Sequence, residues 1–253
     1  MGTHYNSKIP GDPKFYFDIS NPKCISDPGN TTVDANTRLT DLVSGTVQLQ
    51  ANDLSGNQTF VLDNGNYVYD QDGLNGGEPC WHTSASDFTR SNSFSFVCWY
   101  KYNYGSSHQR TDNIYGGGFS GRTSFYLAPG GTSASHGILR YDNSGNNYNY
   151  SLTSTNNGGN DGEWHMFAAT DSYPGVGQAT TSKVYMDGVL KQTGNPSNTG
   201  FQTAPTGQII WGAWTKTYGN FNGRANCFIY YDRVLTDAEV KDIFNATRGR
   251  FGV

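Results

Sequence analysis

The sequence predicts an all-β protein, a two-sheet antiparallel sandwich with one short α-helix at its C-terminal end. The 253 residues include 17 Tyr, 14 Phe and 32 Gly, and aromatic residues suit pleated strands whereas Gly supplies turns. Short apolar segments follow one another with turn signals between them and no helical segment among them, which is typical of a sandwich. Only the segment from residue 230 onward carries a helical pattern.

The first half of the chain carries few strong strand signals outside its hairpin and its alternating segments. Asn64-Gly65 separates two apolar runs and predicts a hairpin turn. The stretch from 21 to 55 is mostly polar and reads as turns. In SFSFVCWYKY, the even-numbered residues from Phe94 to Tyr100 should face one way, and Val97 and Trp99 the other. The expected strand segments are 14–20, 60–70, 93–102, 113–119 and 123–129.

The second half of the chain continues the strand pattern up to residue 235. Asp187-Gly188 predicts a second hairpin, because this residue pair tolerates the positive φ of a type I′ turn. The expected segments are 137–143, 148–154, 163–172, 182–193, 207–214 and 223–235. The sheets should therefore be complete before the helix begins.

The helix after residue 235 has clear start signals. Thr236 is a good N-cap, and Glu239 stands three residues later, as a capping box requires. Leu235 and Val240 are placed for a hydrophobic staple. The apolar face is Val240, Ile243 and Phe244. A helix of about two turns is marginal alone, so we expect it to dock on the sandwich, over a sheet edge or an open end.

One domain over residues 15–253 is the simplest organisation, since no linker or composition break follows residue 15. Residues 1–14 are polar and contain Pro and Gly. We expect them to form an N-terminal arm that orders on a partner.

Charge and hydropathy exclude several classes of protein. The net charge of −4 and the lack of a basic patch argue against nucleic-acid binding. No apolar run approaches the roughly 20 residues of a membrane-spanning helix, so no membrane insertion is expected. The start of the chain does not resemble a secretory signal. The chain is therefore expected either to stay in the cytoplasm or to leave the cell inside something larger.

The four cysteines, Cys24, Cys80, Cys98 and Cys227, have spacings that fit no zinc pattern. Cys98 and Cys227 lie in apolar strand segments and are expected to be buried free thiols. Pairing among the four stays open.

Four C-terminal segments carry a resemblance to a known family. They are EWHMFAATDS (163–172), SKVYMDGVLKQT (182–193), QIIWGAW (208–214) and the segment from FNGRANCF to RGRFGV (221–253). Their order resembles the concanavalin A-like jelly roll in its laminin G and pentraxin-like branch. There a Trp-His strand, a Y-x-D-G hairpin, an F-x-G turn and a strand ending Y-x-R-x-L-T/S precede a short capped helix. The resemblance implies a jelly-roll sandwich of the lectin/glucanase type.

Three further segments resemble virion structural proteins of tailed phages of marine bacteria. They are FDISNP (17–22), LTDLVSG (39–45) and FNATRGRFGV (244–253). This resemblance implies a protein made in the host cytoplasm and exposed on the particle surface. Its partners would be other capsid or tail proteins, in an oligomeric arrangement, together with a host-surface glycan.

The sequence argues against catalysis. Hydrolases on this fold use a strand motif similar to E-x-D-x-E, and none is present. The chain has only three Glu, at 78, 163 and 239, and retaining hydrolysis needs two carboxylates about 5–5.5 Å apart. The histidines fit no zinc motif.

Two loops offer oxygen ligands for calcium. Asp112 and Asn113 lie in RTDNIYG, and Asn160 and Asp161 in NNGGND, and Ca²⁺ prefers such ligands. Solvated turns are the favoured alternative, since Asp and Asn are common turn residues.

A sugar site is expected near the segment 211–223. Trp214, Tyr218 and Asn220 lie in one loop, and Tyr104 lies at another strand end. By the period of a strand, Trp211 and Trp214 face opposite ways, so Trp211 is expected in the core and Trp214 at the ligand. For any single ring, packing between sheets or against a neighbouring subunit is the favoured alternative.

The sequence thus predicts a non-enzymatic virion surface protein, in capsid decoration or in a tail or fibre, that binds glycans weakly for host adhesion. A free-standing lectin domain is the alternative, and a glycoside hydrolase is a more distant one.

Overall fold

A computed structural model describes residues 9–30, 33–51, 59–72, 81–84, 88–89, 93–102, 115–118, 123–128, 135–141, 147–153, 159, 161–172, 181–194, 206–211 and 221–253. These residues form antiparallel sheets and one α-helix, which confirms the predicted fold class. No helix in these segments is long and apolar enough to cross a membrane.

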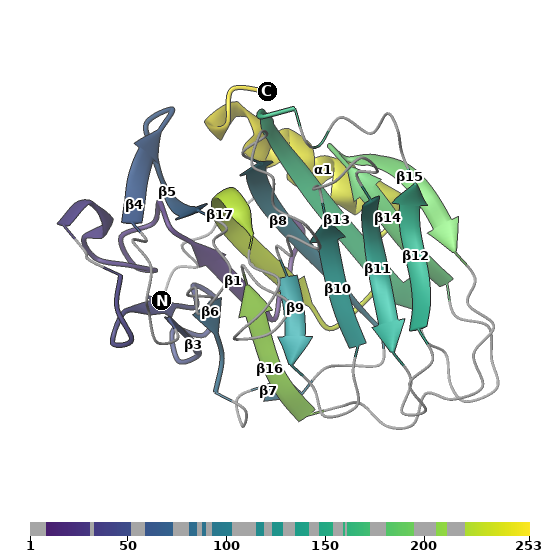
Figure 1. Cartoon of the computed structure of the whole chain (residues 1–253), viewed down its shortest axis with the longest axis horizontal. Coiled ribbons are helices and arrows are strands. Elements are labelled where there is room, and N and C mark those ends of the chain that lie inside the picture. Colours follow the sequence, from purple (N-terminus) through teal and green to yellow (C-terminus); the bar gives the residue numbers. More distant parts are fainter. Residues whose placement is uncertain are drawn as a thin grey trace.

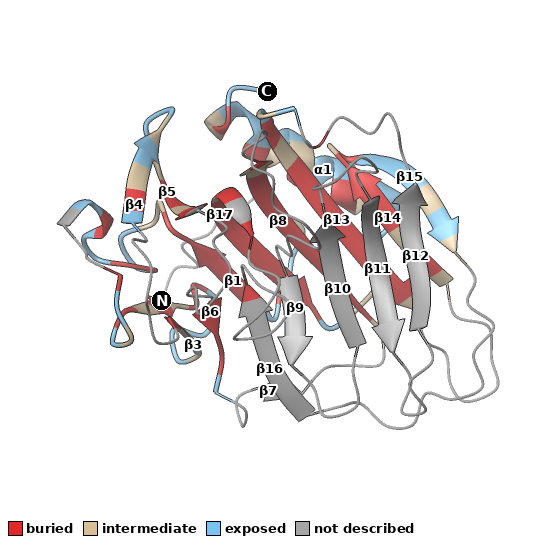
Figure 2. Cartoon of the chain, viewed as in Figure 1, coloured by how far each residue is buried: buried red, intermediate tan, exposed pale blue. Residues whose placement is uncertain are grey.

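The larger sheet has eight strands and forms one layer of the sandwich (Figure 1). Its order is β15-β14-β13-β8-β17-β5-β4, and β1 also pairs with β17. The strands are β1 (Phe15–Asp18), β4 (Thr59–Asp63), β5 (Asn66–Asp72), β8 (Phe94–Tyr102), β13 (Trp164–Ser172), β14 (Thr181–Met186), β15 (Val189–Gly194) and β17 (Asn222–Tyr231). Buried residues fill the central strands, whereas the edge strands β4 and β15 expose more side chains (Figure 2).

The second layer consists of a six-stranded and a three-stranded sheet. The strands are β2 (Arg38–Thr40), β3 (Gln48–Ala51), β6 (Trp81–His82), β7 (Phe88–Thr89), β9 (Tyr115–Gly118) and β16 (Thr206–Trp211), then β10 (Thr123–Ala128), β11 (Ser135–Tyr141) and β12 (Asn147–Thr153). Strand β9 lies beside β10, so the two sheets continue one another (Figure 1). A short 3₁₀ helix, Pro28–Asn30, precedes β2.

The core lies between the layers and is rich in aromatic side chains. Phe96 packs on Phe167 and Phe228, with ring centroids 5.6 and 6.3 Å apart. Trp211 of the second layer lies 6.3 Å from Phe228 and is fully buried. The prediction that Trp211 belongs to the core is confirmed.

Both predicted hairpin turns are confirmed. Asn64 and Gly65 have φ of 49° and 77°, and Asp187 and Gly188 have φ of 53° and 74°. These are the left-handed conformations of a type I′ turn, which Asn, Asp and Gly tolerate. Local chemistry therefore places the turns where the sequence indicated them.

Four short strands in the first half of the chain were not predicted. They are β2, β3, β6 and β7, of two to four residues each. Segments this short carry no measurable alternation, and they become strands because neighbours supply ladder partners, as β3 and β16 do for β6. The polar stretch 21–55 is therefore partly sheet.

The helix α1 (Asp237–Thr247) begins at the predicted cap and is longer than expected. Thr236 Oγ1 accepts from Glu239 N at 3.2 Å, and Glu239 Oε2 accepts from Thr236 N at 2.8 Å. The capping box is confirmed, and Leu235 and Val240 are both buried. The helix has 11 residues, about one turn more than predicted, and a 3₁₀ turn, Arg248–Arg250, follows it.

The helix lies across the outer face of the eight-stranded sheet and also contacts the edge strand β15, so the expectation of a sheet edge is confirmed in part. Trp99 of β8 points to this face. Its Nε1 donates to Thr247 Oγ1 at 2.9 Å, and its ring stacks on Phe244 and Phe251 at 5.8 and 4.2 Å. Trp164 also reaches Phe251, at 4.8 Å. The helix and its tail cover this face because two indoles there would otherwise be exposed to water.

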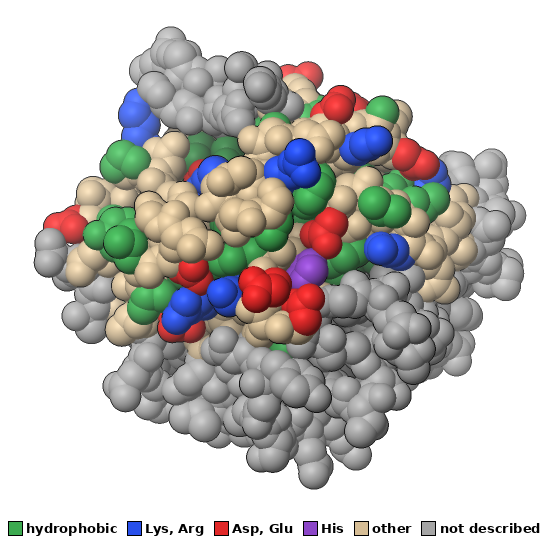
Figure 3. Space-filling view, turned by 90° about the horizontal axis from the view of Figure 1, so that it is seen from above, with side chains coloured by type: hydrophobic (Ala, Val, Ile, Leu, Met, Phe, Trp, Pro, Cys, Tyr) green, Lys and Arg blue, Asp and Glu red, His purple; other side chains and the backbone are tan. Residues whose placement is uncertain are grey.

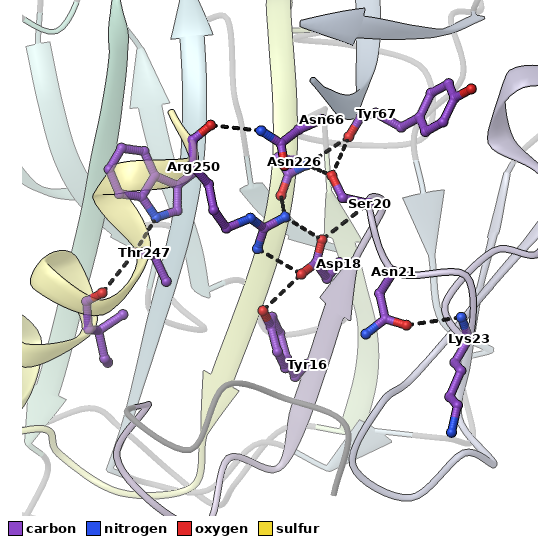
Figure 4. A network of polar contacts seen from close by, with 12 residues as sticks. Tyr16, Asp18, Ser20, Asn21, Lys23, Asn66, Tyr67, Asn226, Thr247 and Arg250 are labelled. Atoms are coloured by element: carbon purple, nitrogen blue, oxygen red, sulfur yellow. Dashed lines mark hydrogen bonds and ion pairs between the residues drawn. The ribbon is translucent and has the colours of Figure 1, made fainter. Parts of the chain in front are cut away.

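A buried polar network joins the first strand to the end of the chain (Figure 4). Arg250 donates from Nη1 to Asp18 Oδ2 at 2.8 Å and from Nη2 to Asp18 Oδ1 at 2.9 Å. Tyr16 Oη donates to Asp18 Oδ2 at 3.0 Å, and Asn226 Oδ1 accepts from Arg250 Nη2 at 3.2 Å. Burial alone would lower the pKa of Arg250, but the Asp18 carboxylate raises it above its usual value. The two hydrogen bonds between Arg250 and Asp18 hold the first strand and the end of the chain together.

The residues of the predicted N-terminal arm that the structure describes, 9–14, lie against the domain. Ile9 is buried, Pro10 O accepts from Tyr231 Oη, and Lys14 N donates to Tyr230 O at 2.7 Å. The role of the arm in assembly stays a prediction.

Replacing Thr236 with Ala is expected to lower the free energy of unfolding by about 0.5–2 kcal/mol, because Glu239 N loses its acceptor. Urea unfolding at neutral pH measures the change. Thr236→Ser, which keeps the hydroxyl, serves as the control and should lie close to the parent. Equal stabilities of the Ala and Ser variants would contradict the cap.

Acid should weaken the same cap. Arg233 lowers the pKa of Glu239 to about 2 through hydrogen bonds of 2.7 and 3.0 Å, against a smaller opposing effect of burial. Because this pKa is lowered on folding, the stability that Glu239 contributes is complete above its ordinary value of 4.5 and is lost as pH falls towards 2.

Candidate binding site

Seven of the eight residues predicted for ligand binding lie outside the described residues. These are the sugar-site residues Tyr104, Trp214, Tyr218 and Asn220 and the metal-site residues Asp112, Asn113 and Asn160. Asp161 is described, and it lies at the entry of β13. The predicted sugar and calcium sites therefore stay predictions.

Asp161 takes part in a polar corner with His165 and Asp187. His165 Nδ1 lies 2.8 Å from Asp187 Oδ2, and His165 Nε2 lies 3.0 Å from Asp161 Oδ1. The left-handed turn at Asp187 aims its carboxylate at β13, where its Oδ1 also accepts from Met166 N at 2.9 Å. Asp161 Oδ1 also accepts from Glu163 N at 2.9 Å. The corner fixes the loop before β13 to the β14–β15 hairpin.

The two carboxylates favour the charged form of His165. Burial alone would lower the pKa of His165, but the hydrogen bonds and charges of Asp187 and Asp161 raise it above 6.5. The contribution of His165 to the free energy of unfolding is therefore fully present below pH 6.5. It is lost as pH rises through the raised pKa.

This corner is not arranged for a metal ion. Its carboxylates bond opposite nitrogens of one ring, so they diverge and do not converge on one point. Among the described residues, no three His, Cys, Asp or Glu side chains are grouped to hold a metal. Cys24, Cys98 and Cys227 are buried free thiols, as expected for Cys98 and Cys227, and burial raises the pKa of Cys24 to about 12.

A group of partly buried ion pairs links β4, β5, β8 and β17 of the large sheet. Arg224 Nη1 lies 2.8 Å from Asp63 Oδ2, its Nε lies 3.5 Å from Asp70 Oδ2, and Lys101 Nζ also approaches Asp63, at 3.9 Å. Acidic and basic side chains are interspersed on the face shown in Figure 3. This pairing leaves the carboxylates neutralised by neighbours, which suits a structural role.

A polar hollow of about 490 Å³ lies between the loop at 22–26 and the segment 34–40. It is lined by Pro22, Lys23, Cys24, Ile25, Ser26, Asp34, Asn36, Thr37, Arg38 and Thr40. Its size falls within the range of small-molecule sites, about 300–1,000 Å³. Sequence reasoning missed it, because no motif marks the stretch and its turns supply the polar residues.

Comparison with solved structures shows the same fold in several binding domains. Domain 4 of AbnA, an extracellular arabinanase of Geobacillus stearothermophilus solved with arabinotriose, is 17% identical with a TM-score of 0.62, over 91% of this chain and 97% of that one. The binding domain of Paraclostridial Mosquitocidal Protein 1 is 15% identical with a TM-score of 0.62, over 85% of this chain. The botulinum neurotoxin serotype D ligand binding domain, solved with N-acetylneuraminic acid, is 11% identical with a TM-score of 0.61, over 93% of this chain.

The chain spans about half the length of the two toxin domains, 51% of each. A search of curated protein sequences finds no match. A sequence profile does match, over residues 75–241, which is about two thirds of the chain. The chain therefore belongs to the Laminin_G_3 family of the concanavalin A-like lectin/glucanases superfamily.

Proposed function

We propose that the chain is a non-enzymatic glycan-binding domain on the surface of a bacteriophage particle, where it decorates the capsid or forms part of the tail or a fibre. Membership of a lectin-type family is the observation that supports glycan binding. The likeness to an arabinanase domain solved with arabinotriose supports it, because that domain has nearly the same extent as this chain. A free-standing lectin domain would have the same fold. Only incorporation into a phage particle would distinguish a virion protein from such a lectin.

The virion location rests on the resemblance of FDISNP, LTDLVSG and FNATRGRFGV to phage proteins. The last of these segments also stabilises the fold. Phe244 and Phe251 stack on Trp99, and Thr247 accepts a hydrogen bond from its indole. The expected partners are neighbouring virion proteins and a host-surface glycan. Many copies on one particle would raise a weak affinity through avidity.

A binding function suits the carboxylates better than hydrolysis does. Glu239 is held by Arg233 and the cap, and Glu163 is an exposed residue before β13. Catalysis by retention or inversion needs two carboxyl groups in different protonation states across one sugar bond. Release of reducing ends from a polysaccharide panel would favour the hydrolase alternative.

We expect the multivalent protein to bind a subset of glycans on an array, with a single-site Kd in the millimolar range, which corresponds to about −4 kcal/mol. Trp214→Ala should weaken this binding at least tenfold, because an aromatic face stacks on the C–H face of a sugar ring. Leu62→Ala removes a side chain that is 63% exposed and serves as the control for non-specific apolar adhesion. Absence of binding, or equal binding by the folded Trp214 variant, would contradict the proposal.

A further inference from the structure

The hollow between residues 22–26 and 34–40 has two walls fixed by backbone hydrogen bonds. On one side, Asn21 Oδ1 accepts from Lys23 N at 3.0 Å, and Cys24 O accepts from Thr40 N at 2.8 Å. Cys24 and Ile25 are buried beneath this loop. The loop is thus tied to β2 and presents Lys23 at its exposed surface, away from the buried network (Figure 4).

The opposite wall is a tight turn built on Asp34. Its Oδ1 accepts from Asn36 N at 2.8 Å and from Thr37 Oγ1 at 3.0 Å. These bonds lower the pKa of Asp34, so the carboxylate is ionised at neutral pH. The ionised carboxylate keeps lone pairs that can accept from a ligand hydroxyl at the rim of the hollow.

Arg38 has N–H groups on Nε and Nη2 that can donate to a ligand. Its Nη1 donates to Ala35 O at 2.7 Å and to Thr37 O at 3.1 Å. A guanidinium has five N–H groups, so these two bonds leave three, on Nε and Nη2. Two adjacent N–H groups of this kind match the two oxygens of a carboxylate. The carbonyls hold the guanidinium in place, which lowers the entropy cost of binding.

The charges of the lining favour an anion that also carries hydroxyls. Lys23 and Arg38 are cationic and Asp34 is anionic, so the hollow is net positive within a chain of net charge −4. Asn36 and the hydroxyls of Ser26 and Thr40 can both donate and accept. A simple anion would use the two cations alone, whereas a sugar acid would also use the amide, hydroxyls and Asp34.

We propose that this hollow binds an acidic saccharide unit, a sugar with a carboxylate or sulfate group beside its hydroxyls. Every lining residue precedes residue 75 and so lies outside the part of the chain that the family profile matches. The hollow shares no residue with the predicted site at Trp214, and the proposal does not depend on that site.

The test is a titration of the full chain with trigalacturonate, its neutral counterpart galactotriose, a monosulfated galactotriose and inorganic sulfate, followed by amide NMR shifts. We expect trigalacturonate or the sulfated triose to shift the amides of residues 23–26 and 34–38, with binding weakened by salt. Galactotriose should bind at least tenfold more weakly. The ratio of the affinities for trigalacturonate and the sulfated triose shows whether the hollow prefers a carboxylate or a sulfate group.

Lys23→Gln and Arg38→Gln should each weaken binding of the acidic ligand at least tenfold. Lys191→Gln removes an exposed lysine of β15 and should change nothing. Lys23 is exposed, so its variant keeps the test valid if the Arg38 variant unfolds. Equal affinity for the neutral triose or for inorganic sulfate, or unchanged binding by Lys23→Gln, would overturn the proposal.

Discussion

Replacing Arg250 with Ala is expected to lower the free energy of unfolding by about 3 kcal/mol, the lower end of the range for breaking a buried ion pair. The lower end applies because the Arg250 side chain is 27% exposed, whereas Asp18 is 9% exposed. The loss comes chiefly from Asp18, a nearly buried carboxyl group that would lose both bonds to the guanidinium. Denaturant unfolding measures it.

Two variants make this prediction specific. Lys241→Ala removes an exposed cation from the preceding helix α1 and should cost less than 0.5 kcal/mol, about the usual effect of a surface change. Combining Arg250→Ala with Asp18→Asn should cost less than the sum of the single changes, because no charge is left stranded. Additive effects, or an Arg250 variant as stable as the Lys241 variant, would show that the pair is not coupled.

Replacing Phe251 with Ala is expected to lower the free energy of unfolding by about 3–5 kcal/mol. Its ring is 3% exposed and lies 4.2 Å from Trp99 and 4.8 Å from Trp164, so truncation opens a cavity against both indoles. Denaturant unfolding followed by tryptophan fluorescence reports both the loss of stability and the changed surroundings of the indoles.

Phe251→Leu keeps most of the apolar volume and should cost clearly less than the Ala variant. Val253→Ala, at a side chain that is 45% exposed, should be nearly neutral. A cost below 1 kcal/mol for Phe251→Ala would mean that the tail does not seal the outer face of the sheet.

Local chemistry was enough to predict several features of this protein. Asn64-Gly65 and Asp187-Gly188 form turns because only a few residue types tolerate φ near +60°. Thr236 and Glu239 start the helix because each satisfies the other's backbone N–H within one turn. Alternation placed Phe96 in the core and Trp99 on the opposite face. In each case the interacting groups lie within a few residues of one another.

The sequence could predict much less about the candidate sites. Its sugar and calcium residues, Asp161 apart, lie outside the described residues, so those sites stay predictions. The hollow at Lys23 and Arg38 was missed because its walls come from two turns that are brought together by the bond between Cys24 O and Thr40 N.

The sequence by itself determined the all-β class, the turns, the cap and the amphipathic faces of the strands, because these depend on near neighbours. The tertiary structure alone decided where the helix docks and which charges pair. Asp18 and Arg250 are 232 residues apart in sequence, and nothing local to either residue indicates the other. They meet because β1 pairs with β17 while α1 and its tail fold back over Trp99, which brings both ends of the chain to the same sheet. Long-range packing of this kind is set by the whole fold, so it becomes visible only in three dimensions.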